Sequence, residues 1–104
     1  MFFKIHKTYR YVFAVCDSDL IGRTFEEGNF QLEVKENFFK GDILKGTSEI
    51  SEKDLINLMQ KFSAEDATFN IVGEKSVKAG LKAGIISKEG IKKIQGVPFA
   101  LVLV

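Results

Sequence analysis

The sequence is poor in the residues that most often build a reactive, cross-linked or metal-bound site. Its 104 residues include one cysteine, one histidine, one proline and no tryptophan. A single cysteine excludes an internal disulfide and any multi-cysteine zinc site. The chain also lacks the recognised motifs of phosphate-binding and catalytic loops. We therefore expect no metal and no other cofactor.

Long hydrophobic runs and targeting segments are also missing. No stretch approaches the roughly 20 apolar residues that are needed to span a bilayer. The first residues, Met1 to Lys7, lack the apolar region and the cleavage site of a signal peptide. We therefore expect a cytoplasmic protein with no membrane partner.

The composition is that of one globular domain. A chain of this length with 45% hydrophobic residues, ten of them phenylalanine, is large enough for its own core. We predict a single domain over residues 1–104. Its charge is uneven, because residues 24–66 carry five lysines against ten acids, whereas residues 67–104 carry six lysines against two acids. This distribution favours an acidic face and a basic face.

Alternating apolar residues predict antiparallel strands in the first 45 residues. A β-hairpin is expected over residues 2–16, with its turn at residues 8–10. Its second strand is apolar on both faces, which is typical of a central strand. Residues 17–19 are interpreted as a turn. Residues 20–25 and 30–34 are predicted to be further short strands.

A helix is predicted to begin at Ser51 and to end near Phe62. Ser51 is a favourable N-cap residue, and Asp54 lies three positions further on, as in a capping box. Ile50 and Leu55 are spaced as a hydrophobic staple across this start.

The segment 68–84 organises the second half of the chain. Residues 69–72 predict a short buried strand, Gly73 predicts a turn, and the period that follows is helical. Residues 97–104 form a final apolar strand, which is expected to be a parallel neighbour of the 69–72 strand. The predicted fold class is α+β, a single compact domain with a mixed β-sheet, an N-terminal antiparallel part and two to three helices.

Lysines in the C-terminal half give the first functional hypothesis. Three of them fall on one side of the predicted helix after Gly73, and two more follow soon after. Such a surface can neutralise the phosphates of RNA, although a solvated helix face is the alternative interpretation. We predict a non-enzymatic binding module that contacts RNA or a ribonucleoprotein. The predicted RNA-binding residues are Lys75, Lys78, Lys82, Lys92, Lys93 and Arg10.

The turn after the 69–72 strand gives a second hypothesis, a small-ligand-binding protein or an enzyme. Backbone N–H groups at a helix start can bind an anion, although Glu74 in the first turn would repel one. Asn70 is a polar residue in an apolar strand, and it either contacts a ligand or pins the turn. The predicted ligand-binding residues are Asn70, Gly73, Glu74 and Ser76.

A third hypothesis is a protein–protein adaptor that uses the acidic segment 24–66 or an exposed strand edge. His6 and Cys16 are compatible with a base and a nucleophile, but no third group marks them as activated. We interpret both as ordinary strand residues. No catalytic and no metal-binding residue is therefore predicted.

Several short motifs occur in an order and spacing that cover nearly the whole chain. They are Lys4 to Arg10, Phe25 to Gly28 with Leu32 to Val34, Phe38 to Gly41, Asn70 to Val77 followed by Gly80-Leu81 or Gly84-Ile85, and Gly96 to Pro98. Together they resemble the small archaeal proteins grouped as domain of unknown function 424. The resemblance implies a cytoplasmic archaeal protein without an assigned activity, for which we expect a connection with RNA or translation. This family has a histidine and a polar residue after Val-Pro, where the present chain has Phe99-Ala100-Leu101, so a site built on those polar groups would be missing here.

Overall fold

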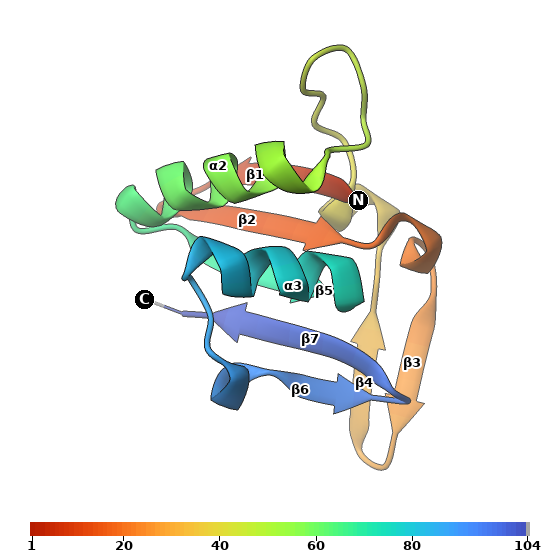
Figure 1. Ribbon diagram of the computed structural model, residues 1–104. Coiled ribbons are helices and arrows are strands. Elements are labelled where there is room, and N and C mark those ends of the chain that lie inside the picture. Colours follow the sequence, from red (N-terminus) through yellow and green to blue (C-terminus); the bar gives the residue numbers. More distant parts are fainter. Residues whose placement is uncertain (104) are drawn as a thin grey trace.

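A five-stranded mixed sheet forms the centre of the computed structural model, which describes residues 1–103 (Figure 1). The elements in chain order are β1 (Phe2–Lys7), β2 (Tyr11–Cys16), the 3-10 turn η1 (Ser18–Leu20), β3 (Thr24–Glu27), β4 (Phe30–Glu33), α1 (Glu36–Phe39), α2 (Glu52–Ala64), β5 (Thr68–Val72), α3 (Glu74–Ala83), the 3-10 turn η2 (Lys88–Gly90), β6 (Lys92–Ile94) and β7 (Val97–Val102). The strand order in the sheet is β1-β2-β5-β7-β6, and β3 pairs separately with β4. Strands β1 and β2 are antiparallel, β2 and β5 are parallel, and the remaining pairs are antiparallel. The predicted α+β class with a mixed sheet is therefore confirmed.

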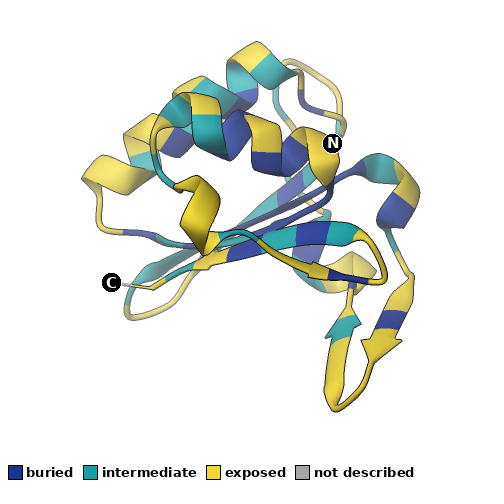
Figure 2. Ribbon diagram, turned by 60° about the horizontal axis from the view of Figure 1, so that its bottom comes forward, coloured by how far each residue is buried: buried dark blue, intermediate teal, exposed yellow. Residues whose placement is uncertain are grey.

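Helices α2 and α3 cover one face of the sheet, and α1 and the β3–β4 hairpin lie on the other side (Figure 1, Figure 2). Strand β2 lies between these layers and is buried on both faces. Phe13 and Val15 belong to the helix-side core, whereas Ala14 and Cys16 belong to the hairpin-side core. Because successive strand residues point to opposite faces, this arrangement explains why β2 is apolar throughout, as predicted for a central strand.

The predicted parallel pairing of the 69–72 and 97–104 strands is wrong. Strand β7 runs antiparallel to β5, and the parallel neighbour of β5 is β2. The reason is the additional strand β6, which residues 92–94 form before a tight turn at Gln95 and Gly96 reverses the chain into β7. The expected strand at residues 20–25 is also wrong over its first part, where η1 and a turn precede β3.

The predicted start of the helix α2 is confirmed. The Ser51 hydroxyl oxygen accepts a hydrogen bond from the backbone N–H of Asp54 at 3.3 Å. Ile50 and Leu55 are both buried, as a hydrophobic staple requires. None of the helices within residues 1–103 has the length and apolar character that crossing a membrane would demand.

Glycines set both ends of α3. Gly73 precedes its first turn with φ +109°, and Gly84 ends it in the left-handed conformation with φ +77°. Gly80 lies on the inner face, where a Cβ would come within 3.0 Å of the Ile86 side chain. The inner face of α3 is therefore made of small residues that let the helix approach its neighbours closely.

Candidate functional site

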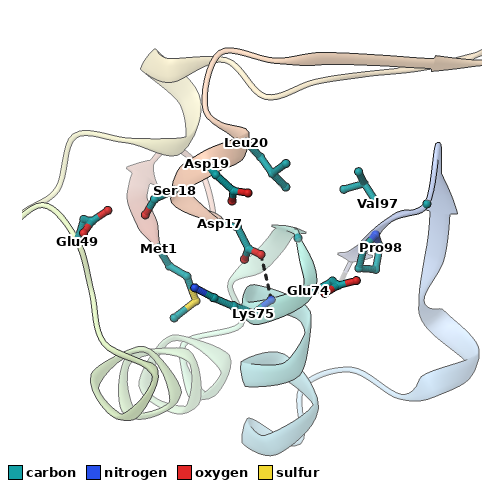
Figure 3. Close-up of a pocket in the computed structure, with 12 residues that line it drawn as sticks. Met1, Asp17, Ser18, Asp19, Leu20, Glu49, Glu74, Lys75, Val97 and Pro98 are labelled. Carbon is teal, nitrogen blue, oxygen red and sulfur yellow. Dashed lines mark hydrogen bonds between the residues drawn. The ribbon is translucent and has the colours of Figure 1, made fainter.

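A carboxylate from a distant part of the chain closes the start of α3 (Figure 3). Asp17 follows β2 directly and is only 7% exposed. Its side chain accepts hydrogen bonds from the backbone N–H of Lys75 (3.0 Å), the backbone N–H of Ser76 (2.8 Å) and the Ser76 hydroxyl (2.8 Å). Asp17 is thus a capping residue that the positive end of the helix dipole also stabilises.

The parallel pairing of β2 and β5 explains how Asp17 reaches α3. Cys16 lies opposite Val72, and the backbone N–H of Asp17 donates to the Val72 carbonyl at 3.0 Å. The next residue of the second strand is Gly73, and a Cβ at this position would overlap the Asp17 carboxylate. Glycine is therefore required here both by the backbone conformation and by the space that Asp17 occupies.

An open cavity of about 630 Å³ lies beside this cap, at the carboxyl ends of the two parallel strands. Of the predicted ligand-binding residues, Gly73 and Glu74 line the cavity. Ser76 does not line it, because it is fully buried and its hydroxyl is hydrogen-bonded to Asp17. Because Asp17 occupies two N–H groups of the helix start, the donors that a bound anion would use are already bonded. The other lining residues are Met1, Asp17, Ser18, Asp19, Leu20, Glu49, Lys75, Gly96, Val97 and Pro98.

Asn70 lies apart from this cavity. In β5 it is a neighbour of Ala14 and Leu101, on the sheet face opposite to α3. It is half-buried, and the turn at Gly73 follows three residues later. The structure therefore does not bring Asn70 together with Glu74 and Ser76.

The predicted lysines are all exposed but occupy several elements. Lys75, Lys78 and Lys82 follow the outer surface of α3. Lys82 forms an ion pair with Glu52 of α2 at 2.8 Å, and this hydrogen bond lowers the pKa of the Glu52 carboxyl below its usual value. Lys92 and Lys93 lie on β6 and, as consecutive strand residues, point to opposite faces of the sheet.

Arg10 lies at the opposite end of β2 from Lys75. It belongs to the β1–β2 turn, where its guanidinium donates to the Asp66 carbonyl at 3.4 Å. Strand β2 runs from this turn to Asp17 and the start of α3, so about 20 Å of strand separates the two positions. The structure thus separates Arg10 from the lysine stripe of α3.

His6 and Cys16 are also far apart. In the β1–β2 register His6 lies opposite Val12, whereas Cys16 lies opposite Phe2, four residues away along the strand. The His6 ring is stacked on Phe38 and is hydrogen-bonded to its carbonyl at 2.8 Å. Burial raises the pKa of the Cys16 thiol to about 12, so the thiol is neutral at physiological pH. Neither residue is arranged as part of a nucleophile–base pair.

The sequence-based prediction misses two residues, Asp17 of the capped turn and Lys88 on η2. The sequence indicates only a turn at Asp17, and Lys88 is exposed like the predicted RNA-binding lysines. No local pattern marks Asp17 as a helix cap, because its partners lie 58 and 59 positions later. Its position directly after a central strand is the one available signal.

The architecture and the capped turn define a small α+β domain with a mixed sheet. The chain belongs to the family described as "Protein of unknown function (DUF424)", whose model matches residues 6–104. The fold is similar to the crystal structure of an uncharacterized conserved protein from Methanopyrus kandleri, an archaeon. That chain is 23% identical, the alignment covers 97% of the present chain and 88% of the other, and the TM-score is 0.79. No curated protein matches the sequence.

Proposed function

We propose that this protein is a non-enzymatic binding module that contacts the phosphates of RNA, free or within a ribonucleoprotein, through its lysine-rich C-terminal half. One observation carries the proposal: all six lysines between positions 75 and 93 are exposed, against two glutamates in residues 74–93. They come from α3, η2 and β6, which follow one another in the chain. A cytoplasmic location is expected with this function.

The free lysines of α3 are the centre of the proposed contact. Lys82 is already paired with Glu52, whereas the ion pairs found within residues 1–103 do not involve Lys75 or Lys78. Exposed, solvated ammonium groups suit a phosphate backbone, since they act as point charges without fixed geometry. Binding is therefore expected to depend on salt and only slightly on base sequence.

Fluorescence anisotropy with a labelled mixed-sequence RNA tests the proposal at low and moderate salt. The test variant is Lys75→Glu/Lys78→Glu. Its matched control is Lys53→Glu/Lys61→Glu, which makes the same charge change at two exposed positions of α2. We expect the wild type to bind, the test variant to lose most affinity, and the control to lose much less.

The salt dependence gives a second readout. For single-stranded RNA, the slope of log affinity against log salt should decrease in magnitude by about 0.7 for each phosphate contact removed. A wild type that does not bind at low salt contradicts the proposal. Equal losses in the two double variants would contradict the assignment to α3.

The cavity beside Asp17 favours a second candidate function, the binding of a small molecule. Its position at the carboxyl ends of parallel strands is one where ligands of α/β sheets commonly bind. Because Asp17 already occupies the helix start, a phosphate is not the expected ligand. Titration of ¹⁵N-labelled protein with small-molecule probes should shift the amide signals of Gly73 and Glu74. The absence of any shift at these two residues across such probes would count against this function.

A further inference from the structure

The outer half of the β3–β4 hairpin, residues 26–31, is exposed although it carries the large aromatic residue Phe30. Phe25, at the base, is 4% exposed within the hairpin-side core, whereas Phe30, near the tip, is 77% exposed. Figure 2 shows the hairpin standing out from the body of the molecule, with exposed residues along most of its length. Because a two-stranded hairpin is at best marginally stable alone, burial of the exposed Phe30 side chain in a further contact is expected to stabilise it.

Gln95 anchors this hairpin beside β6. Its backbone N–H donates to the Glu27 carboxylate at 2.9 Å, and its side-chain amide donates to the Glu26 carbonyl at 2.8 Å. Between the hairpin and the sheet lies a small pocket of about 80 Å³ with an apolar floor of Ile94 and Phe99. Lys92, Lys93, Glu27 and Phe30 complete its lining.

The two edges of the sheet differ. Along the β1 edge, the backbone N–H of Asp42 donates to the Phe3 carbonyl at 3.2 Å, and the Asp42 carboxylate accepts from the N–H of Ile5 at 2.8 Å. A loop of the chain thus covers that edge. At the other edge, β6 pairs with β7, and no second strand within the described residues is hydrogen-bonded to it in the sheet. The edge next to the hairpin is therefore the one left open.

The hairpin and the β6 edge carry opposite charges. Residues 24–33 contain three glutamates and no basic residue, whereas β6 presents Lys92 and Lys93. Two copies related by a twofold axis can place the hairpin of each against the edge of the other, so that both contacts bring glutamates against lysines. The Phe30 side chain of each copy would then be removed from water and would pack against Ile94 and Phe99 in the other copy's pocket.

We propose that this surface is an interface between two copies of the protein, in which each copy lays the outer half of its hairpin against the β6 edge of its partner. Direct pairing of the two β6 strands is not part of the proposal. If two β6 strands paired antiparallel about their central residue, Lys93 of one copy would lie directly opposite Lys93 of the other, and like charges directly opposite are destabilising. The interface covers Lys92 and Lys93, so in the dimer the proposed RNA contact is made by the other four of the six lysines, those of α3 and η2.

Sedimentation velocity from low micromolar to submillimolar concentration tests the interface. We expect the mass of the wild type to rise from that of one chain toward twice that value. Phe30→Glu should weaken the dimer by about tenfold or more, since it puts a charge at the buried centre of the contact. Tyr9→Glu is the matched control, because Tyr9 is fully exposed in the β1–β2 turn and should leave the dimer unchanged.

A charge exchange distinguishes this interface from any other dimer. Glu26→Lys/Gln31→Lys, at two exposed positions that face each other in the outer half of the hairpin, and Lys92→Glu/Lys93→Glu should each be monomeric alone, because each places like charges at both contacts. Their mixture should dimerise, because both contacts then join opposite charges. Circular dichroism and thermal unfolding establish that each variant is folded. A wild type that stays monomeric throughout, a dimer insensitive to Phe30→Glu, or a mixture that stays monomeric would each overturn the proposal.

Discussion

Gly73 and Asp17 are the two residues on which the start of α3 most depends. The φ of +109° at Gly73 is one that side chains rarely adopt, and a Cβ there would overlap the Asp17 carboxylate. Gly73→Ala combines backbone strain with the displacement of a buried charge. We expect the substitution to lower the free energy of unfolding, measured with urea, by roughly 2–5 kcal/mol.

Gly28→Ala is the control that introduces backbone strain without a steric overlap, because Gly28 has a φ of +61° but no atom within 4 Å of its added Cβ. It should lower the free energy of unfolding by about 1 kcal/mol. In an Asp17→Gly background the overlap at Gly73 is absent, so Gly73→Ala should cost closer to this smaller value. An equal cost of Gly73→Ala in both backgrounds would show that the carboxylate is not the obstacle.

Asp17 stabilises α3 more than Ser76 does, because the charged acceptor serves three donors and the hydroxyl supplies one of them. Asp17→Asn should lower the free energy of unfolding by about 2–3 kcal/mol, and Ser76→Ala by about 1 kcal/mol. Both values come from urea unfolding of the single variants. A larger loss for Ser76→Ala would contradict the assignment of Asp17 as the helix cap.

At the scale of elements, α2 owes its starting point to Ser51. Ser51→Ala removes the acceptor of the Asp54 N–H and should lower the free energy of unfolding by about 1 kcal/mol. Ser63→Ala is the matched control, since Ser63 is an exposed serine inside the same helix and alanine has the higher helix propensity. Thermal unfolding should show a loss for Ser51→Ala and no loss for Ser63→Ala; equal changes would contradict the cap.

The elements could be predicted from the sequence better than their pairing could. The period of residues 51–62 and the double-sided apolar run of β2 are local signals, and both predictions are confirmed. The direction of β7 depends on β6, which has only three residues, two of them lysines, and lacks a detectable strand pattern. Asp17 could not be assigned as a cap for the same reason, since its role follows only from the pairing of β2 with β5.

At the scale of the whole molecule, the fold separates residues that the sequence analysis assigned to one ligand-binding site. It brings Gly73 and Glu74 to one cavity and leaves Asn70 on the other face of the sheet. The basic segment forms α3, η2 and β6 in succession, and its Lys82 pairs with Glu52 of the acidic segment, so the two segments meet where α2 packs on α3. Contact with RNA through the lysine-rich C-terminal half stays a prediction that the anisotropy experiment tests.

Cys16 connects the stability of the whole molecule to pH. It is fully buried at the end of β2, within the hairpin-side core, and burial, followed by the neighbouring Asp17 charge, raises the pKa of its thiol from 9.0 to about 12. The folded state thus favours the neutral thiol. The resulting stabilisation is fully present below pH 9.0 and is lost as the pH rises from 9.0 through about 12, because the unfolded chain releases its proton first.

The free energy of unfolding of the wild type should therefore fall by about 1 kcal/mol through this thiol as the pH rises to one unit above 9.0. Cys16→Ala removes the titrating thiol and leaves every other ionisable side chain in place. Urea unfolding at several alkaline pH values should give a shallower decline for Cys16→Ala than for the wild type, whatever the stability of the variant at neutral pH. Identical declines would mean that the thiol titrates alike in the folded and unfolded chain, which is incompatible with its burial between the two layers.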